Sequence, residues 1–241
     1  AGYFALEGFD LGVGMLLPVL GKKRDDRDRM VAAIAPYVLA NEVWLVAVAG
    51  TLFGVYPMLE GELLPALYPL VVAMLLAWIL RDAGLWFRRR AGGPRWRAFW
   101  DGMIVLGSLW LSFGWGLVLY AAATGFSGPL MHPLGLLLGA AVTALFAWHG
   151  RVFLGWRLPG FAGPARTGKA LLISAAVAAL PALVLLGGAM PHLLDHSAPT
   201  ATLNVLGLMV LPFAPIMLGA QLWIWRTFRP GKGADRNPSF F

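Results

Sequence analysis

Apolar residues run in seven long stretches along the chain, separated by short polar connections. Each stretch is long enough for an α-helix to cross a bilayer core of roughly 30 Å, and none has the alternating ten-residue pattern of a membrane β-barrel. Pro181, Pro212 and Pro215 lie inside apolar stretches, where they predict kinks. The pattern predicts seven membrane-spanning helices, at residues 1–20, 30–57, 63–87, 98–124, 133–156, 169–190 and 203–225.

The composition supports an all-α integral membrane protein, with residues 1–241 forming a single transmembrane helical domain. Hydrophobic residues make up 59% of the chain and charged residues 13%, and the mean hydropathy is +0.71. Soluble proteins carry about 25% charged residues. The chain has no cysteine, which excludes a disulfide and a thiolate metal site. It opens on Ala1 without an initiating Met, so we expect residues to be missing ahead of the first span.

The basic residues predict how the helices are oriented. The basic segments at 21–29, 88–97 and 150–169, around the first, third and fifth connections, and the tail at 226–241 together hold 18 of the 19 Lys and Arg, whereas the second, fourth and sixth connections hold none. Basic connections face the cytoplasm, so we expect the N-terminus outside and the C-terminus in the cytoplasm. The net charge of +7 therefore reflects topology, and because no basic connection belongs to a separate domain we expect no nucleic-acid partner.

The remaining charges lie where the bilayer would bury them. Arg81 lies near the end of the third span, seven residues before Arg88 in the connection that follows, or about 10 Å of helix. It could extend its side chain to the headgroups, or it could pair with a buried acid, for which Glu7, Asp10, Glu42 and Asp101 are the candidates. We expect Asp82, the neighbour of Arg81, to point elsewhere around its helix.

Glu7 and Asp10 are three residues apart, so a helix places them on one face. Two ionised carboxylates there would be unfavourable unless one is protonated or a cation lies nearby. They could stabilise a kink at Gly8 or hydrogen-bond a neighbouring helix. They could instead serve a proton or charge relay, or act as the counter-charge of a redox cofactor in a partner.

Several motifs, in order along the chain, resemble subunit II of the cytochrome bd quinol oxidases. They are EGFDLGVGMLLPVLG, DRMVAAIAPYVLANEVWLV, YPLVVAMLLAWILRDAGLWFR, RWRAFWDGMIVLGS and TLNVLGLMVLPFAPIMLGAQLWIW. The pair GFDLGVGML and NEVWL is more specific than either motif alone. The resemblance covers most of the chain.

The resemblance implies an accessory subunit of a terminal oxidase in the bacterial cytoplasmic membrane. Such a complex oxidises quinol and reduces dioxygen to water, and its subunit I carries haems b and d. Subunit II forms a heterodimer with subunit I, stabilises it and shapes access of oxygen and protons. Small single-helix subunits and membrane lipid are further expected partners.

The same resemblance implies roles for individual residues. Asp10, Arg81 and Glu7 would form a charge network near the haem site of the partner, without bond-making chemistry of their own. Glu42 and Asp101 would offer a possible proton path.

This chain also departs from the family pattern. Two acids of a proposed proton route are replaced by Leu39 and Trp86, and a terminal aromatic hydroxyl is replaced by Phe241. None of these side chains passes a proton, which argues against that route in this subunit. Family members usually have about two more spans between what are here the sixth and seventh, so the chain looks like a short variant.

The resemblance also implies that no haem is bound by ligands of this chain, and the four histidines fit that expectation. His132, His192 and His196 fall in predicted external connections, and His149 stands near the cytoplasmic end of the fifth span. Bis-histidine ligation needs two histidines at similar depth on facing helices. We expect no metal site, because histidines and acids are not clustered in the sequence.

An independent ion-coupled transporter is the alternative function. In that case Glu7, Asp10, Glu42 and Arg81 would line the path of an ion or substrate at a broken helix. The chain lacks the internal repeat symmetry that such carriers tend to show, and the order of the motifs favours the oxidase subunit.

Overall fold

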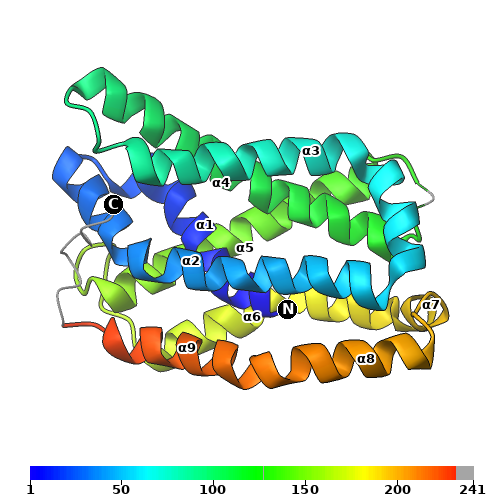
Figure 1. Ribbon diagram of the computed structural model, residues 1–241. Helices are drawn as coiled ribbons and strands as arrows, with labels where there is room; N and C mark the ends of the chain where they lie inside the picture. The colour runs from blue at the N-terminus through cyan, green and yellow to red at the C-terminus, as the bar shows by residue number, and fades with distance from the viewer. Residues whose placement is uncertain (127, 232–241) are drawn as a thin grey trace.

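The computed structural model describes residues 1–126 and 128–231, and these form an all-helical bundle with no β-strand among them. Figure 1 shows the long helices lying side by side, with successive helices running in opposite directions. The helices are α1 Gly2–Leu20, α2 Arg24–Val55, α3 Pro57–Phe87, α4 Pro94–Ala123, α5 Pro133–Arg157, α6 Gly168–Gly188, α7 Met190–Asp195, α8 Thr200–Val210 and α9 Ala214–Thr227.

Seven segments of these helices are long and apolar enough to cross a membrane, which confirms the predicted number of spans. Hydropathy misses the polar first turn of α2, which begins at Arg24 rather than near residue 30. Asp25 and Asp26 lie in that turn, where carboxylates favour the positive end of the helix dipole. The Lys23 amide also donates to Asp26 Oδ2 at 3.1 Å.

The seventh span consists of two helices joined by a short 3₁₀ turn. α8 and α9 are joined by a 3₁₀ turn at Leu211–Phe213, and the two helices cover Thr200–Thr227. Pro212 lies in the turn and Pro215 at the start of α9, so the last span is interrupted where these prolines lie, whereas α6 continues through Pro181. Proline removes a backbone donor and disfavours continuation of the preceding helix.

α1 is the central helix of the bundle. It packs against α2, α4, α5 and α6, and 67% of its membrane window is buried, against 0% for the seventh span. The close crossing of α1 and α5 depends on two glycines: a Cβ placed on Gly150 would lie 2.5 Å from the carbonyl carbon of Gly12. Glu7 and Asp10, which lie on α1 before Gly12, are 1% and 0% exposed.

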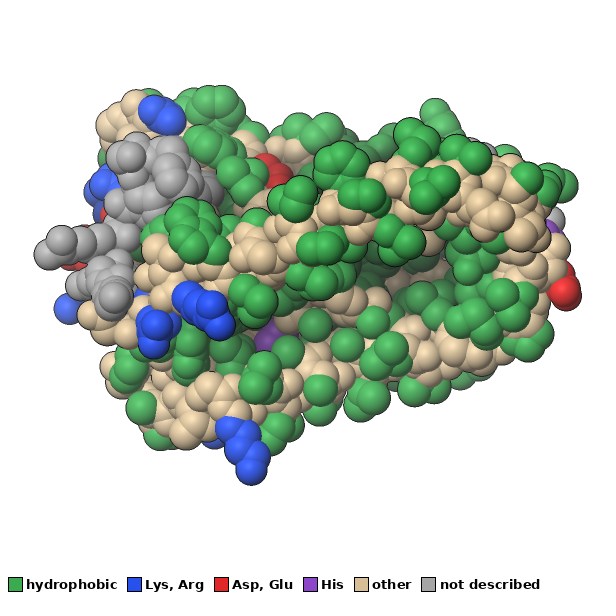
Figure 2. Space-filling model, turned by 60° about the horizontal axis from the view of Figure 1, so that its bottom comes forward, with side chains coloured by type: hydrophobic (Ala, Val, Ile, Leu, Met, Phe, Trp, Pro, Cys, Tyr) green, Lys and Arg blue, Asp and Glu red, His purple; other side chains and the backbone are tan. Residues whose placement is uncertain are grey.

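One end of the bundle is basic. Lys and Arg side chains gather toward one end in Figure 2, while hydrophobic side chains cover much of the rest of that face. At this end two buried side chains donate hydrogen bonds to the residues that follow α9. The Tyr37 hydroxyl donates to the Phe228 carbonyl at 2.6 Å, and Arg157 Nη1 donates to the Arg229 carbonyl at 3.0 Å. The chain that follows α9 therefore begins at the basic end of the bundle.

Candidate functional site: a buried charge network

Arg81 on α3 is the centre of an ion-pair network inside the bundle. Its side chain is 1% exposed, and its Nη1 lies 2.8 Å from Glu7 Oε1 on α1 and 3.4 Å from Glu42 Oε1 on α2. Arg81 therefore pairs with buried acids and does not extend to the headgroups. Charges at this depth persist when they are paired or solvated inside the protein.

Asp82 also belongs to the network, so the expectation that it points elsewhere is wrong. Its Oδ1 lies 3.1 Å from Arg81 Nη1. Neighbouring side chains leave a helix in directions roughly 100° apart, but the long arginine side chain bends back far enough to reach the carboxylate. One guanidinium nitrogen is thus shared by three carboxylates from three positions in the sequence.

The network reaches the surface of the bundle between α2 and α3. The side chain of Glu42 is 11% exposed and that of Asp82 is 25% exposed, whereas Glu7 and Arg81 are each 1% exposed. Trp78 on α3 donates its indole Nε1–H to Glu42 Oε1 at 3.1 Å. Charge therefore extends from the interior at Glu7 to an edge at Glu42 and Asp82.

Asp10 is held by a different set of partners on the same side of α1. Asn41 on α2 donates Nδ2–H to Asp10 Oδ2 at 2.7 Å and to the Leu6 carbonyl at 3.1 Å. Gln221 on α9 donates to Asn41 Oδ1 at 2.9 Å. This chain of amides connects the seventh span to a fully buried carboxylate.

Sequence reasoning missed Asn41 and Gln221. Asn41 stands directly before Glu42 in the NEVW motif, and Gln221 is the one Asn or Gln between residues 205 and 236. A lone amide in an apolar span was the available signal, because a bilayer disfavours an amide without a partner. The sequence gives no means to pair two amides that lie 180 positions apart.

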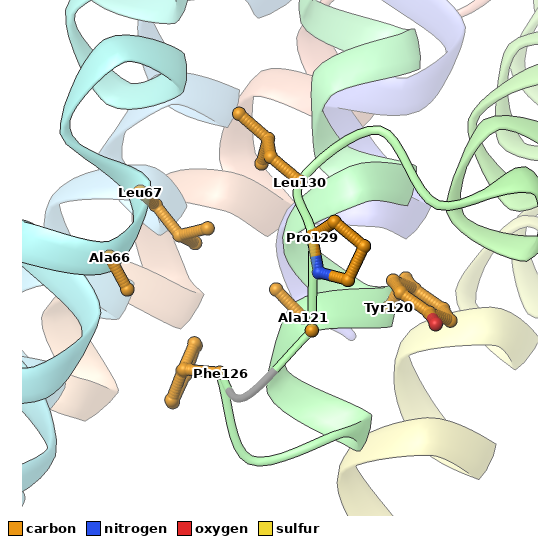
Figure 3. A pocket seen from close by; sticks show the side chains of 8 residues that line it. Ala66, Leu67, Tyr120, Ala121, Phe126, Pro129 and Leu130 are labelled. Atoms are coloured by element: carbon orange, nitrogen blue, oxygen red, sulfur yellow. The ribbon is translucent and has the colours of Figure 1, made fainter.

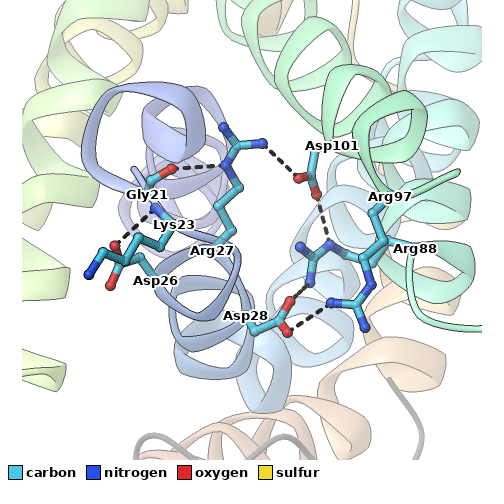
Figure 4. Close-up of polar contacts among 8 residues, drawn as sticks. All are labelled: Gly21, Lys23, Asp26, Arg27, Asp28, Arg88, Arg97 and Asp101. Carbon is cyan, nitrogen blue, oxygen red and sulfur yellow. Dashed lines mark hydrogen bonds and ion pairs between the residues drawn. The ribbon is translucent and has the colours of Figure 1, made fainter. Parts of the chain in front are cut away.

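Asp101 lies in a separate cluster at the basic end and pairs with Arg27 and Arg88 rather than with Arg81. Its Oδ2 is 3.0 Å from Arg27 Nη1, and its Oδ1 is 2.9 Å from Arg88 Nε. Figure 4 shows Arg88 and Arg97 both turned toward Asp28, at 2.6 and 3.1 Å. These pairs connect α2, α3 and α4 at the basic end.

His149 does not fit the role of a haem ligand. Its ring is buried, with Nδ1 2.8 Å from Ser174 Oγ and Nε2 3.1 Å from the Ala5 carbonyl. Both ring nitrogens are engaged within the protein, and Phe9 packs edge-on against the ring. Among the described residues no group of three or more His, Cys, Asp or Glu could hold a metal ion.

The structure describes two of the three positions where the chain departs from the family pattern. Leu39 is exposed on α2, and Trp86 is half-buried on α3. Phe241 lies outside the described residues.

A small hollow at the end opposite the basic connections is a weaker candidate site. It lies between α3 and the connection from α4 to α5, and in Figure 3 Leu67, Phe126, Pro129 and Leu130 surround it. No charged side chain lines it, so it offers neither a catalytic group nor an anchor for a charged ligand.

Fold and site together define a multi-pass helical membrane protein with buried ionisable groups. The family model for cytochrome bd terminal oxidase subunit II matches residues 1–195, and the chain belongs to that family. The chain is thus a multi-pass protein of the bacterial inner membrane.

Curated relatives agree with this family. The chain is 30% identical to cytochrome bd-I ubiquinol oxidase subunit 2 of Escherichia coli K12 over 174 residues, which are 66% of this chain and 46% of the relative. It is 32% identical to cytochrome bd ubiquinol oxidase subunit 2 of Bacillus subtilis 168 over 170 residues, 66% of this chain and 50% of the relative. The match therefore spans about half the length of these relatives.

Proposed function

We propose that the chain is the accessory subunit of a terminal oxidase that oxidises quinol and reduces dioxygen to water. Family membership and the two relatives support this function. In the proposed complex subunit I carries the haems b and d. His149, the histidine best buried in the bundle, is already bonded to Ser174 and Ala5, which favours a role without haem ligation for this chain.

The proposed contact surface for subunit I is the α2–α3 edge together with the seventh span. Leu39, Val43 and Val46 are exposed on α2 at spacings of four and three residues, which places them on one face. Glu42 lies beside this apolar row, and its side chain is the part of the network that is exposed on α2. The seventh span packs mainly on α2 and has no buried residue in its membrane window, so a large apolar area is available to a partner.

The network would act at this contact as a fixed set of charges. Glu7, Glu42 and Asp82 surround a single arginine nitrogen, and Asp10 lies nearby on the same helix as Glu7. Acids outnumber the cation, so neutrality in the bilayer requires protons or positive charge from outside this chain. A charged redox centre in subunit I, or protons moving to it, would supply that balance.

Glu42 and Asp82 are the acids of this set that can exchange protons most readily with a partner or water, because they lie at the edge. Asp101, the second residue of the possible proton path, is held by Arg27 and Arg88 at the basic end. We propose that this end faces the cytoplasm, so that Asp101 lies at the cytoplasmic entrance of the possible proton path. The concentration of basic residues at one end supports this orientation.

The proposal rests mainly on the Arg81 network. Its Glu7 is buried, whereas its Glu42 is partly exposed beside the apolar row on α2. Mild detergent extraction from native membranes, mass spectrometry of the co-purifying proteins and a reduced-minus-oxidised spectrum test it. We expect a larger haem-bearing membrane protein in fixed ratio to this chain. A colourless protein that purifies alone from intact membranes would contradict the oxidase function and favour ion transport.

A further inference from the structure

A stripe of exposed residues runs along α5. Its members follow one another at spacings of three or four residues, so they lie on one face of the helix. They are Leu134, Leu137, Ala141, Ala144, Trp148 and Arg151, and all six are exposed. Ala141 and Ala144 carry the smallest side chains of this α5 stripe, so the helix surface is lower there than at Leu137 or Trp148. The stripe is therefore apolar along most of its length and ends in an arginine.

A second arginine lies against the same end of α5. The backbone N–H of Arg166 donates to the Gly155 carbonyl at 3.0 Å, and a Cβ placed on Gly155 would lie 2.7 Å from Arg166 Cγ. Gly155 follows Arg151 by four residues, which places the two positions on one face of α5. Arg151 itself reaches the connection to α6, because its Nη2 would lie 3.8 Å from a Cβ placed on Gly163. The two arginines are therefore neighbours on the last two turns of α5.

Positive charge in this part of the chain has no acid to balance it. Residues 150–169 contain three arginines, one lysine and neither Asp nor Glu. Arg157 turns inward and donates to the Arg229 carbonyl. Arg151 and Arg166 are exposed, and within residues 1–126 and 128–231 the side chain of neither forms an ion pair or a hydrogen bond. Both guanidinium groups are thus available to an anionic ligand.

The position of the arginines along the helix suits the headgroup layer of a bilayer. In Figure 1 the connection between α5 and α6 lies at the same end of the bundle as the first turn of α2, which is the basic end. Trp148 is 42% exposed and lies three residues before Arg151, or about 4.5 Å of helix toward the middle of the span. Tryptophan favours the boundary between headgroups and acyl chains. The stripe thus presents charge, an aromatic ring and an apolar surface in the order in which a phospholipid presents phosphate, glycerol and acyl chain.

We propose that the α5 stripe binds an anionic phospholipid. Arg151 and Arg166 hold the phosphate, because guanidinium groups match phosphate oxygens in charge and geometry. Trp148 contacts the glycerol region, and an acyl chain lies over Ala141 and Ala144. Charge complementarity selects this occupant: a headgroup with a net negative charge gains from two unpaired arginines, whereas a zwitterionic headgroup gains little. The site is separate from the proposed contact with subunit I, since α5 packs mainly against α1, α4 and α6.

Native mass spectrometry of the protein, purified with the partners that it keeps in mild detergent, tests this site. The sample is stripped of lipid and titrated with phosphatidylglycerol or phosphatidylethanolamine, with inorganic phosphate as competitor. The variant replaces Arg151 and Arg166 by Gln. The matched control replaces Arg24 and Arg95 by Gln, because these are exposed arginines at the same end of the bundle and their loss removes the same charge.

We expect the wild type and the control to bind phosphatidylglycerol about 10- to 30-fold more tightly than the variant without Arg151 and Arg166 does. Phosphatidylethanolamine should bind weakly to all three. Ala144→Phe, which fills the low part of the stripe, should weaken both lipids and keep the preference for the anionic one. Equal loss in the control and the variant would overturn the proposal, since binding would then follow total charge. Displacement of the lipid by inorganic phosphate at equal concentration would overturn it as well, because the site would then bind a free anion.

Discussion

Arg81 on α3 and Glu7 on α1 form an ion pair of 2.8 Å in which each side chain is 1% exposed. The two residues lie 74 positions apart in the chain. Their pairing explains how two charges persist in apolar spans, because each replaces much of the solvation that the other loses. It also places α1, α2 and α3 around one guanidinium group, since Glu42 shares the same nitrogen.

Arg81→Gln should destabilise the protein strongly. The substitution leaves Glu7 and Glu42 without their cation, and removing one partner of a buried pair costs about 3–5 kcal/mol. Glu7→Gln should cost less, because Arg81 keeps Glu42 and Asp82. Thermal unfolding in detergent measures both. Adding Glu7→Gln to Arg81→Gln should restore part of the loss; a double variant worse than the sum of its parts would contradict the pairing.

Gln221→Leu should loosen the seventh span. Gln221 donates to Asn41 at 2.9 Å and is the one residue of α9 that the structure gives as buried. An interhelical hydrogen bond of this kind contributes about 0.6–2 kcal/mol. Hydrogen exchange of the α9 amides should become faster, while exchange in α4 stays unchanged. Leu222→Ala, at an exposed position of the same helix, is the control and should leave exchange close to that of the wild type.

Asp10→Asn tests the proposed link to the partner. The amide keeps the shape of the side chain, so the complex should assemble, but the fixed charge beside Asn41 is lost. We expect quinol-supported oxygen uptake to fall about tenfold, which corresponds to ~1.4 kcal/mol, together with a shifted haem spectrum. Asp25→Asn, at an exposed position in the first turn of α2, should change neither. Normal uptake and spectra with Asp10→Asn would remove this residue from the proposed network.

Gly150→Ala should separate α1 from α5. The added Cβ would lie 2.5 Å from backbone atoms of Gly12 and Val13, which cannot move aside as a flexible side chain could. Overpacking of this kind costs about 1–3 kcal/mol, so the unfolding temperature and the yield of folded protein should fall. Gly187→Ala is the matched control, because nothing lies within 4 Å of its Cβ. If both variants unfold at the same temperature, the close crossing is not a source of stability.

The spans could be predicted from the sequence because hydropathy and helix length act locally. The same holds for the interruption of the last span at Pro212 and for the identity of the buried charged residues, since an isolated ionisable group in an apolar run is conspicuous. The prediction of helix ends was less accurate. Hydropathy does not detect the polar first turn of α2, because a hydrogen bond between Lys23 and Asp26 stabilises it rather than apolar burial.

The partners of these charges were beyond sequence reasoning, because they depend on how the helices pack. Asp101 and Glu42 looked equivalent as partners of Arg81, yet only Glu42 is near it, while Asp101 meets Arg27 and Arg88. The direction of a long side chain is equally hidden, and Arg81 reaches Asp82 for that reason.

The most direct test of the account is photocrosslinking at the α2 face in native membranes. A photoreactive amino acid at Val46, which is 64% exposed beside the Glu42 edge, should capture the haem-bearing subunit. The same group at Leu172 on α6, which is 72% exposed, should capture lipid and not that subunit. Capture of the haem-bearing subunit from Leu172 but not from Val46 would contradict the proposal that the buried charge network opens toward the redox partner.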